Sequence, residues 1–155
     1  MRPIRFKAIA LGTREMVEGY YAHQHIAVFD KDENTILRYQ EEDAIYNDEP
    51  GNRKGSYWTR IEPDTLCQQT GADDIFFMPI WEHDIVMMHS RNAPHGDPYH
   101  EATAEVVFLQ TCFALLTDDG KRMLLERARA DYELQVVGNS FLQQTFHRRD
   151  VHQFA

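Results

Sequence analysis

Two acidic side chains in the middle of the chain are the first candidates for chemistry. Glu82 and Asp84 stand two positions apart, so on an extended chain they point to the same side. Carboxylates held that close perturb each other's pKa, as in catalytic carboxylate pairs. No activated nucleophile or base stands beside them in the sequence. We therefore expect them to lie at a strand entrance, solvated or accepting backbone N–H bonds, with a catalytic pair as the alternative.

A histidine-rich stretch supplies the second group. Its candidate metal ligands are His89, His95, Asp97, His100 and Glu101. Zinc requires three or four N, S or O ligands that converge at about 2.0–2.3 Å from the ion. The spacing in this stretch matches no recognised metal motif, and a chain with eight histidines brings some of them together by chance. We expect a polar surface loop without metal or cofactor, and we interpret His23 and His25, on one face of another predicted strand, in the same way.

The common enzyme motifs are missing from the sequence. It contains no Gly-x-Gly-x-x-Gly, no P-loop, no Gly-x-Ser-x-Gly and no His-Glu-x-x-His. Cys67 and Cys112 form no Cys-x-x-Cys pair, and thiols so far apart are usually buried small hydrophobes. The sequence thus predicts no catalytic residue and a protein that is not an enzyme. A small metal-dependent or carboxylate-based hydrolase is the alternative.

The charge balance disfavours nucleic acid as a partner. The chain has 16 Lys and Arg against 25 Asp and Glu, a net charge of −9, whereas affinity for phosphate backbones rests on neutralising them with basic residues. Arg122, Glu126 and Arg129 stand one turn apart on a predicted helix, which favours a salt-bridged, solvated face. A nucleic-acid-binding accessory protein stays as a second alternative.

Length and hydropathy predict one cytoplasmic domain. The 155 residues fit a single domain over 1–155, with 139–155 as a C-terminal arm. Charges interrupt the start of the chain where a signal peptide requires an apolar run. No stretch approaches the roughly 20 apolar residues of a membrane helix, so we expect no membrane association.

Short apolar or alternating segments, separated by turns, predict a mainly β fold. The predicted strands are 4–9, 16–21, 25–29, 35–39, 57–61, 84–88, 104–109, 112–116 and 134–138. A polar turn is expected over 30–34. Strong helix formers predict one helix near the C-terminus, over 121–132. Many short strands with one helix indicate a small β-barrel or sandwich.

Three blocks of sequence follow one another in an order and spacing that resemble a known family. The first is MRPIRFKA at 1–8 followed by Met16 and Val17, the second is TLCQQTG at 65–71 with IWEHDIV at 80–86, and the third is AEVVF at 104–108 with LQVVGN at 134–139. They are similar to the opening strand, the Gln-x-Thr-Gly turn, the Ile-Tyr-Glu-Gly-Asp-Ile-Val motif and the Glu-Val-Ile-Gly-Asn ending of the YopX family of phage and prophage proteins. The match is weak over 20–60 and 140–155.

The resemblance implies a β-rich fold from a phage-derived gene, often oligomeric, and no catalytic residues. Two departures from the family pattern are informative. His83 replaces a family glycine, and histidine tolerates a left-handed backbone better than most residues. The apolar run 75–79 replaces a polar, glycine-containing hairpin turn.

That apolar run predicts an interaction patch. Its residues are Ile75, Phe76, Phe77, Met78 and the nearby Trp81. Alternate side chains of a hairpin point opposite ways, so they cannot all face one interior, and an exposed apolar patch marks an interaction site. The alternative is that residues 20–60 or the tail, with Phe141, Leu142, Phe146 and Phe154, cover the run. We expect a non-enzymatic interaction module that works as a homo-oligomer or binds a phage or host protein.

Overall fold

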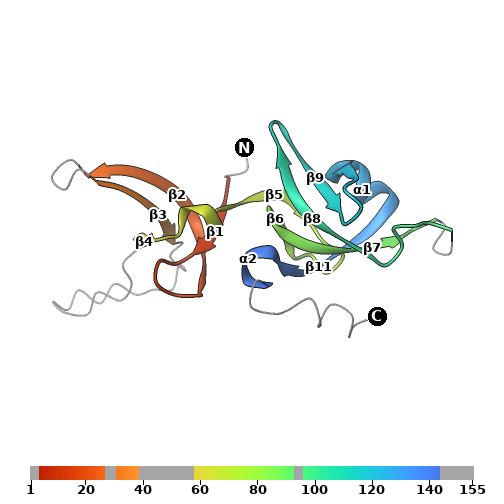
Figure 1. Ribbon diagram of the computed structural model, residues 1–155, viewed down its shortest axis with the longest axis horizontal. Coiled ribbons are helices and arrows are strands. Elements are labelled where there is room, and N and C mark those ends of the chain that lie inside the picture. The colour runs from red at the N-terminus through yellow and green to blue at the C-terminus, as the bar shows by residue number, and fades with distance from the viewer. Residues whose placement is uncertain (1–3, 27–30, 39–57, 93–95, 144–155) are drawn as a thin grey trace. The chain divides into compact units, whose positions relative to one another are not determined.

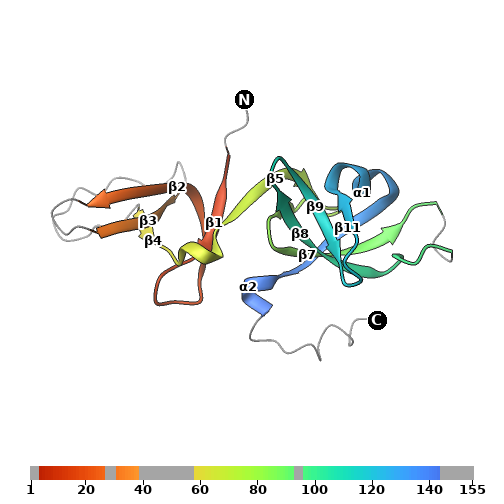
Figure 2. The same cartoon turned by 45° about the horizontal axis from the view of Figure 1, so that its top comes forward.

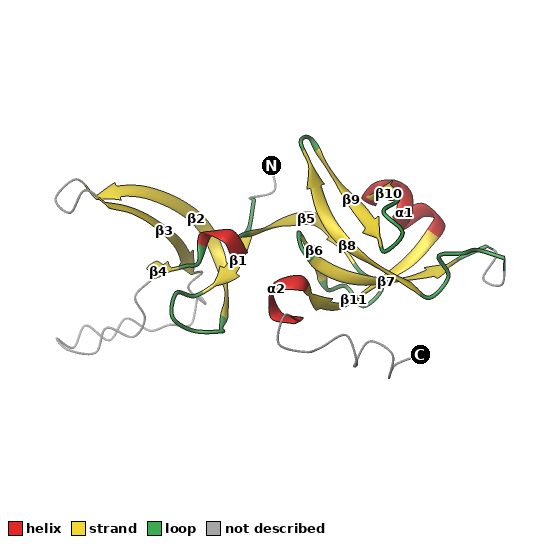
Figure 3. Ribbon diagram, viewed as in Figure 1, coloured by secondary structure: helices red, strands yellow, loops and turns green. Residues whose placement is uncertain are grey.

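The computed structural model describes residues 4–26, 31–38, 58–92 and 96–143 of the chain (Figure 1). Strands dominate the described residues (Figure 3), so the expected mainly β fold is confirmed. The chain divides into two compact units, residues 1–68 and 69–155, which we describe one at a time. That the whole chain acts as a single domain stays a prediction.

The first unit is an antiparallel sheet in the order β4-β3-β2-β1-β5. Its strands are β1 (Phe6–Ile9), β2 (Met16–Ile26), β3 (Lys31–Arg38), β4 (Trp58–Arg60) and the start of β5 (Cys67–Asp73), with a 3₁₀ turn, η1 (Pro63–Thr65), before β5. A small core of Ala8, Val17, Ile36 and Ile61 supports the sheet. Cys67 is buried, as the sequence predicts, whereas Cys112 in the second unit is only half-buried.

The hairpin between β2 and β3 corrects the expected turn over 30–34. In the structure β3 already begins at Lys31, and Asp32 and Asn34 stand opposite His25 and His23. The side chains join across the strands, with His25 Nδ1 at 2.8 Å from Asp32 Oδ1 and His23 Nδ1 at 3.0 Å from Asn34 Oδ1. Such cross-strand pairs stabilise polar residues in a sheet, so the polar run extends the strand. Residues 27–30 lie outside the described residues.

The second unit is built on the antiparallel sheet β10-β9-β8-β7-β11. Its strands are β7 (Asp84–Ser90), β8 (Ala102–Leu109), β9 (Cys112–Thr117), β10 (Arg122–Leu124) and β11 (Tyr132–Asn139) (Figure 2). The end of β5 pairs with β6 (Pro79–Trp81). Two short helices, α1 (Leu125–Asp131) and α2 (Ser140–Gln143), flank β11 in the sequence.

The core of this unit comes from alternate positions of the strands. Val86 and Met88 of β7 and Val106 of β8 are fully buried, while their neighbours are partly exposed. Helix α1 adds Leu125 and Ala128 to the same cluster. Burial in β7 and β8 therefore follows the two-residue period of a strand.

The predicted helix over 121–132 is only partly correct. Residues 122–124 form strand β10, in which Met123 pairs with Leu115 of β9. At the other end Tyr132 already belongs to β11 and pairs with Ser90. Pairing with the sheet overrides the helix propensity at both ends, so α1 keeps only the middle of the run.

The described strands form open sheets with edge strands, so a closed barrel is not what this part of the chain forms. The described residues contain a second short helix, α2, whereas the sequence predicted a single helix. None of the described helices is long and apolar enough to cross a membrane.

Candidate functional site

The turn between β5 and β6 carries the predicted apolar residues on its surface. Phe76 is 63% and Phe77 85% exposed, and Ile75 and Met78 are exposed beside them. We call these four residues the apolar tip. Trp81 does not belong to it, since the side chain is only 4% exposed. Trp81 lies in β6, opposite Gln69 and beyond the turn, so it packs within the unit.

A buried carboxylate holds the apolar tip in place. Asp74 is 7% exposed, and its Oδ1 accepts the backbone N–H groups of Phe76 at 2.8 Å and Met78 at 2.9 Å. Its Oδ2 accepts the N–H of Val136 in β11 at 3.0 Å. Hydrogen bonds to an ionised acceptor are the strong ones. One side chain thus ties the turn to itself and to the neighbouring strand.

Backbone hydrogen bonds close the same turn. The amide of Asp74 donates to Met78 O at 2.8 Å, and the amide of Phe77 donates to Asp74 O at 3.0 Å. The amide of Ile75 donates to Leu134 O of β11 at 3.0 Å. The apolar tip is therefore a rigid projection whose backbone is fixed on both sides.

Phe77 adopts a backbone conformation that favours glycine. Its φ is 61°, in the left-handed region where a bulky side chain is an outlier. The third residue of a three-residue hairpin loop normally takes this conformation, and glycine is the usual residue there. A large residue in such a place costs about 1–3 kcal/mol. Phe77 thus combines a strained backbone with a solvent-exposed aromatic ring.

A small hollow of about 290 Å³ lies beside the tip. Ile75 and Leu134 give it an apolar wall, and Asp73, Arg91 and Arg129 give it charges of both signs. Asp73 and Arg129 are exposed. A partner surface at this place would meet an apolar projection with one exposed acidic side chain and two exposed basic side chains next to it.

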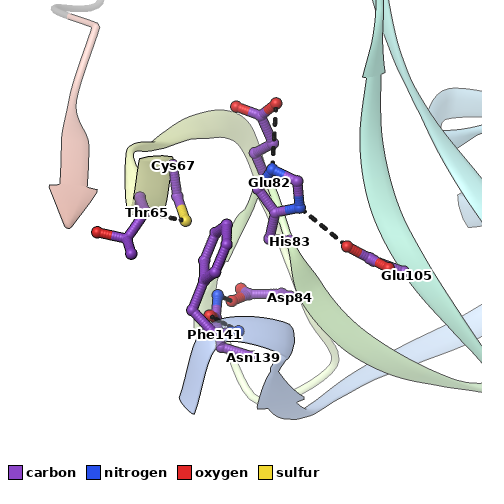
Figure 4. Close-up of polar contacts among 8 residues, drawn as sticks. All are labelled: Thr65, Cys67, Glu82, His83, Asp84, Glu105, Asn139 and Phe141. Carbon is purple, nitrogen blue, oxygen red and sulfur yellow. Dashed lines mark hydrogen bonds and ion pairs between the residues drawn. The ribbon is translucent and has the colours of Figure 1, made fainter. Parts of the chain in front are cut away.

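The acidic turn of Glu82 and Asp84 serves the fold (Figure 4). Asp84 is 1% exposed, and its carboxylate accepts the N–H of Trp81 at 2.8 Å and the Nδ2–H of Asn139 at 3.0 Å. Glu82 stands in the turn before β7 and faces His83, with Oε1 3.7 Å from Nε2. The two carboxylates do not share a strand face as expected from the sequence, because the strand begins only at Asp84. They contact different partners and do not form a carboxylate pair.

His83 has the left-handed backbone that its place in the sequence suggests. Its φ is 64°, its amide donates to Val106 O at 2.7 Å, and its Nδ1 lies 2.9 Å from Glu105 Oε1. The ring contacts Phe141 edge-on at 4.7 Å between centroids (Figure 4). Phe141 therefore packs against His83 at this turn. Leu142 is exposed, and Phe146 and Phe154 lie outside the described residues.

The histidine-rich stretch brings together three of its five candidate ligands. His89, His100 and Glu101 offer ligand atoms within 4.8 Å of one another. However, the Ser90 amide donates to His100 Nδ1 at 3.0 Å, so the neutral ring carries its proton on Nε2 and has no free lone pair for a metal. Asp97 accepts the Tyr99 amide at 2.8 Å instead, and His95 lies outside the described residues. This hydrogen bonding favours the polar loop over the metal site.

No family model and no curated protein matches this chain. Function is therefore inferred from the geometry of the apolar tip. Sequence reasoning found its apolar residues but missed Asp74, which holds them. The signal was present, because Asp is a preferred first residue of a type I turn and its side chain bonds the following amides.

Asp97 and Tyr132 form a coupled pair near α1. The Tyr132 hydroxyl donates to Asp97, and this bond, together with the Tyr99 amide, lowers the pKa of the carboxyl. Burial, and then the same bond, raise the pKa of Tyr132 to about 12. Asp97 therefore stays ionised and Tyr132 stays protonated across the neutral range.

We expect Tyr132→Phe to lower the free energy of unfolding at neutral pH by about 1 kcal/mol, because the donor to Asp97 is lost. Since the pKa of folded Asp97 lies below its ordinary value of 3.8, the stabilisation is present above that pH and fades as the pH falls below it. Urea unfolding at pH 7 and pH 3 measures both values. Thr70→Val is the control, because that hydroxyl donates to the uncharged backbone carbonyl of Ile80 at 2.8 Å and its loss should not depend on pH. Equal deficits of Tyr132→Phe at both pH values would contradict the assignment.

Proposed function

We propose that this chain is a non-enzymatic interaction module of phage or prophage origin with a YopX-like fold, which associates with a second copy of itself through the apolar tip. One observation carries the proposal. Phe77 is 85% exposed in a backbone conformation that favours glycine. A solvent-exposed aromatic ring at a strained backbone position lowers the stability of the monomer without a compensating stabilisation. Such strained positions cluster at functional sites.

The YopX-like fold is supported by where the three resembling blocks lie. They fall on β1 with the start of β2, on β5 to the first part of β7, and on β8 with β11. His83, which replaces a family glycine, has a φ of 64°. That conformation is the one that would explain a glycine at this position.

A second copy is the partner that the charges around the tip fit. Asp73 and Arg129 line the hollow beside Ile75 and are both exposed. In a two-fold dimer each surface meets its own copy, so residue i of one copy contacts residue j of the other and the reverse. Arg129 of one copy would then face Asp73 of the other, on the rim of an apolar centre formed by the two tips. An apolar core with a polar rim is the usual anatomy of an interface.

The decisive variant is Phe76→Asp with Phe77→Asp. Because both rings are exposed, we expect a folded monomer in place of the wild-type oligomer. At a dilution at which the wild type is also monomeric, the melting temperature of the variant should lie within about 3 °C of that of wild type. Light scattering coupled to gel filtration gives the mass, and a thermal melt gives the stability. Leu11→Asp also replaces an exposed apolar side chain with an acid, but in a turn of the first unit, and should leave the mass unchanged. A wild type that is monomeric at all concentrations, or a double variant of unchanged mass, would refute the proposal.

Phe77→Gly separates self-association from folding. Glycine adopts the left-handed backbone without strain. At a dilution at which wild type and variant are both monomeric, we expect the melting temperature to rise by a few degrees, for about 1 kcal/mol of relieved strain, while at higher concentration the oligomer weakens. The two effects have opposite signs, which a general loss of folding cannot produce. A lower melting temperature for Phe77→Gly would show that the ring packs within its own chain.

A further inference from the structure

The basic side chains of residues 69–143 gather at two places. Among residues 69–143 the Lys and Arg residues are Arg91, Lys121, Arg122, Arg127 and Arg129. Each of them lines one of two hollows, although acidic residues outnumber them more than twofold in this stretch. The smaller hollow, with Arg91 and Arg129, is the one beside the apolar tip. The larger hollow is lined by Lys121, Arg122 and Arg127.

The larger hollow is open to solvent and has the volume of a small-molecule site. Its volume is about 760 Å³, within the range of about 300–1,000 Å³ that ligand pockets occupy. Residues 96–99, β10 and α1 form its walls. Pro98, Met123 and Leu124 provide apolar surface, next to Lys121, Arg122 and Arg127.

The two carboxylates in this hollow already have partners. Asp97 accepts the Tyr132 hydroxyl and the Tyr99 amide, and Asp131 lies 3.8 Å from Arg127 Nε. Lys121 Nζ stands 4.9 Å above the Tyr99 ring, a contact that leaves its positive charge in place. Arg122 is exposed on β10. A positive charge therefore persists at the mouth of the hollow.

These groups select an anion of limited size. Guanidinium groups bind phosphate oxygens in pairs, and an ammonium adds a point charge. A net charge of −9 opposes a long polyphosphate chain, whereas a single phosphate with an apolar or aromatic body suits the mixed wall. We propose that this hollow binds a small organic phosphate monoester, with Lys121, Arg122 and Arg127 on the phosphate and Met123 and Leu124 against its body. This site is independent of the apolar tip.

Adenosine 5′-monophosphate is the probe, titrated by calorimetry into the full chain, with inorganic phosphate and adenosine in parallel. We expect the monophosphate to bind with a Kd below about 1 mM and more tightly than either fragment, because both halves of the hollow contribute. Arg122→Ala with Arg127→Ala should weaken it by about tenfold or more. Arg91→Ala, an exposed arginine at the other hollow, is the matched control and should bind as wild type does.

Three results would overturn the proposal: no measurable binding of the monophosphate, equal affinity for inorganic phosphate, or equal weakening by Arg91→Ala. Thermal melts of each variant confirm that the fold is intact. Phe76→Asp with Phe77→Asp should bind the monophosphate like wild type, so that a failure of the dimer and a failure of this site are told apart.

Discussion

Replacing Asp74 with alanine is expected to lower the free energy of unfolding by about 3–5 kcal/mol, since each hydrogen bond to a charged group contributes about 1.5–3 kcal/mol and the three share one acceptor group. The carboxylate is buried and accepts the amides of Phe76, Met78 and Val136. Alanine leaves these donors without that acceptor. Urea unfolding, followed by circular dichroism, measures the difference.

The neighbouring Asp73→Ala is the matched control. Asp73 is exposed, so its loss should change the free energy of unfolding by no more than about 0.5 kcal/mol. Asp74→Asn should fall between the two, because its amide keeps one acceptor oxygen and replaces the other with a donor. Equal stabilities for the Asp73 and Asp74 variants would show that the turn is held by its backbone alone.

The second large effect is expected at the turn before β7. Asp84→Ala removes the acceptor of the Trp81 amide and of Asn139 Nδ2 in a fully buried place, and should cost about 3 kcal/mol. Asn139→Ala removes the other side of that bond and the acceptor of the Phe141 amide. Because the two side chains share a hydrogen bond, the double variant should lose about 1 kcal/mol less than the sum of the single losses.

Hydrogen exchange adds a local readout to this cycle. Loss of Asn139 Oδ1 frees the Phe141 amide at the start of α2, so its exchange should accelerate more than that of Val106 in the centre of the sheet. Glu82→Ala, at the partly exposed acid of the same turn, should leave both rates unchanged. Additive losses from Asp84→Ala and Asn139→Ala would contradict the coupling.

The strands that the sequence predicted well are the apolar ones. Residues 84–88, 104–109 and 112–116 all lie in strands, because short apolar segments bounded by turns are typical of buried strands. The polar start of β3 and the short strand β10 had no such pattern. They are strands because of partners, Asp32 opposite His25 and Met123 opposite Leu115, and a pairing between two strands is not visible in the hydrophobic pattern of one of them.

The sequence likewise predicted one part of the candidate site and missed another. The apolar run predicted the tip, because four large apolar residues in succession fit no half-buried strand. Trp81 was wrongly included, since nearness in sequence was taken for nearness in space. The hollow near α1 was not predicted, because Arg122 and Arg127 were placed on one helix while the structure puts Arg122 on a strand.

The attachment of the tip to β11 also has a bearing on aggregation. Strand β11 is the last strand of its sheet, and an unpaired strand edge is a template on which further chains can add. Here the outward carbonyl of Leu134 and amide of Val136 are occupied by Ile75 and Asp74, so the turn covers the edge that it crosses. Any variant that releases Asp74 uncovers that edge next to exposed phenylalanines, and fibre formation would then compete with ordinary unfolding.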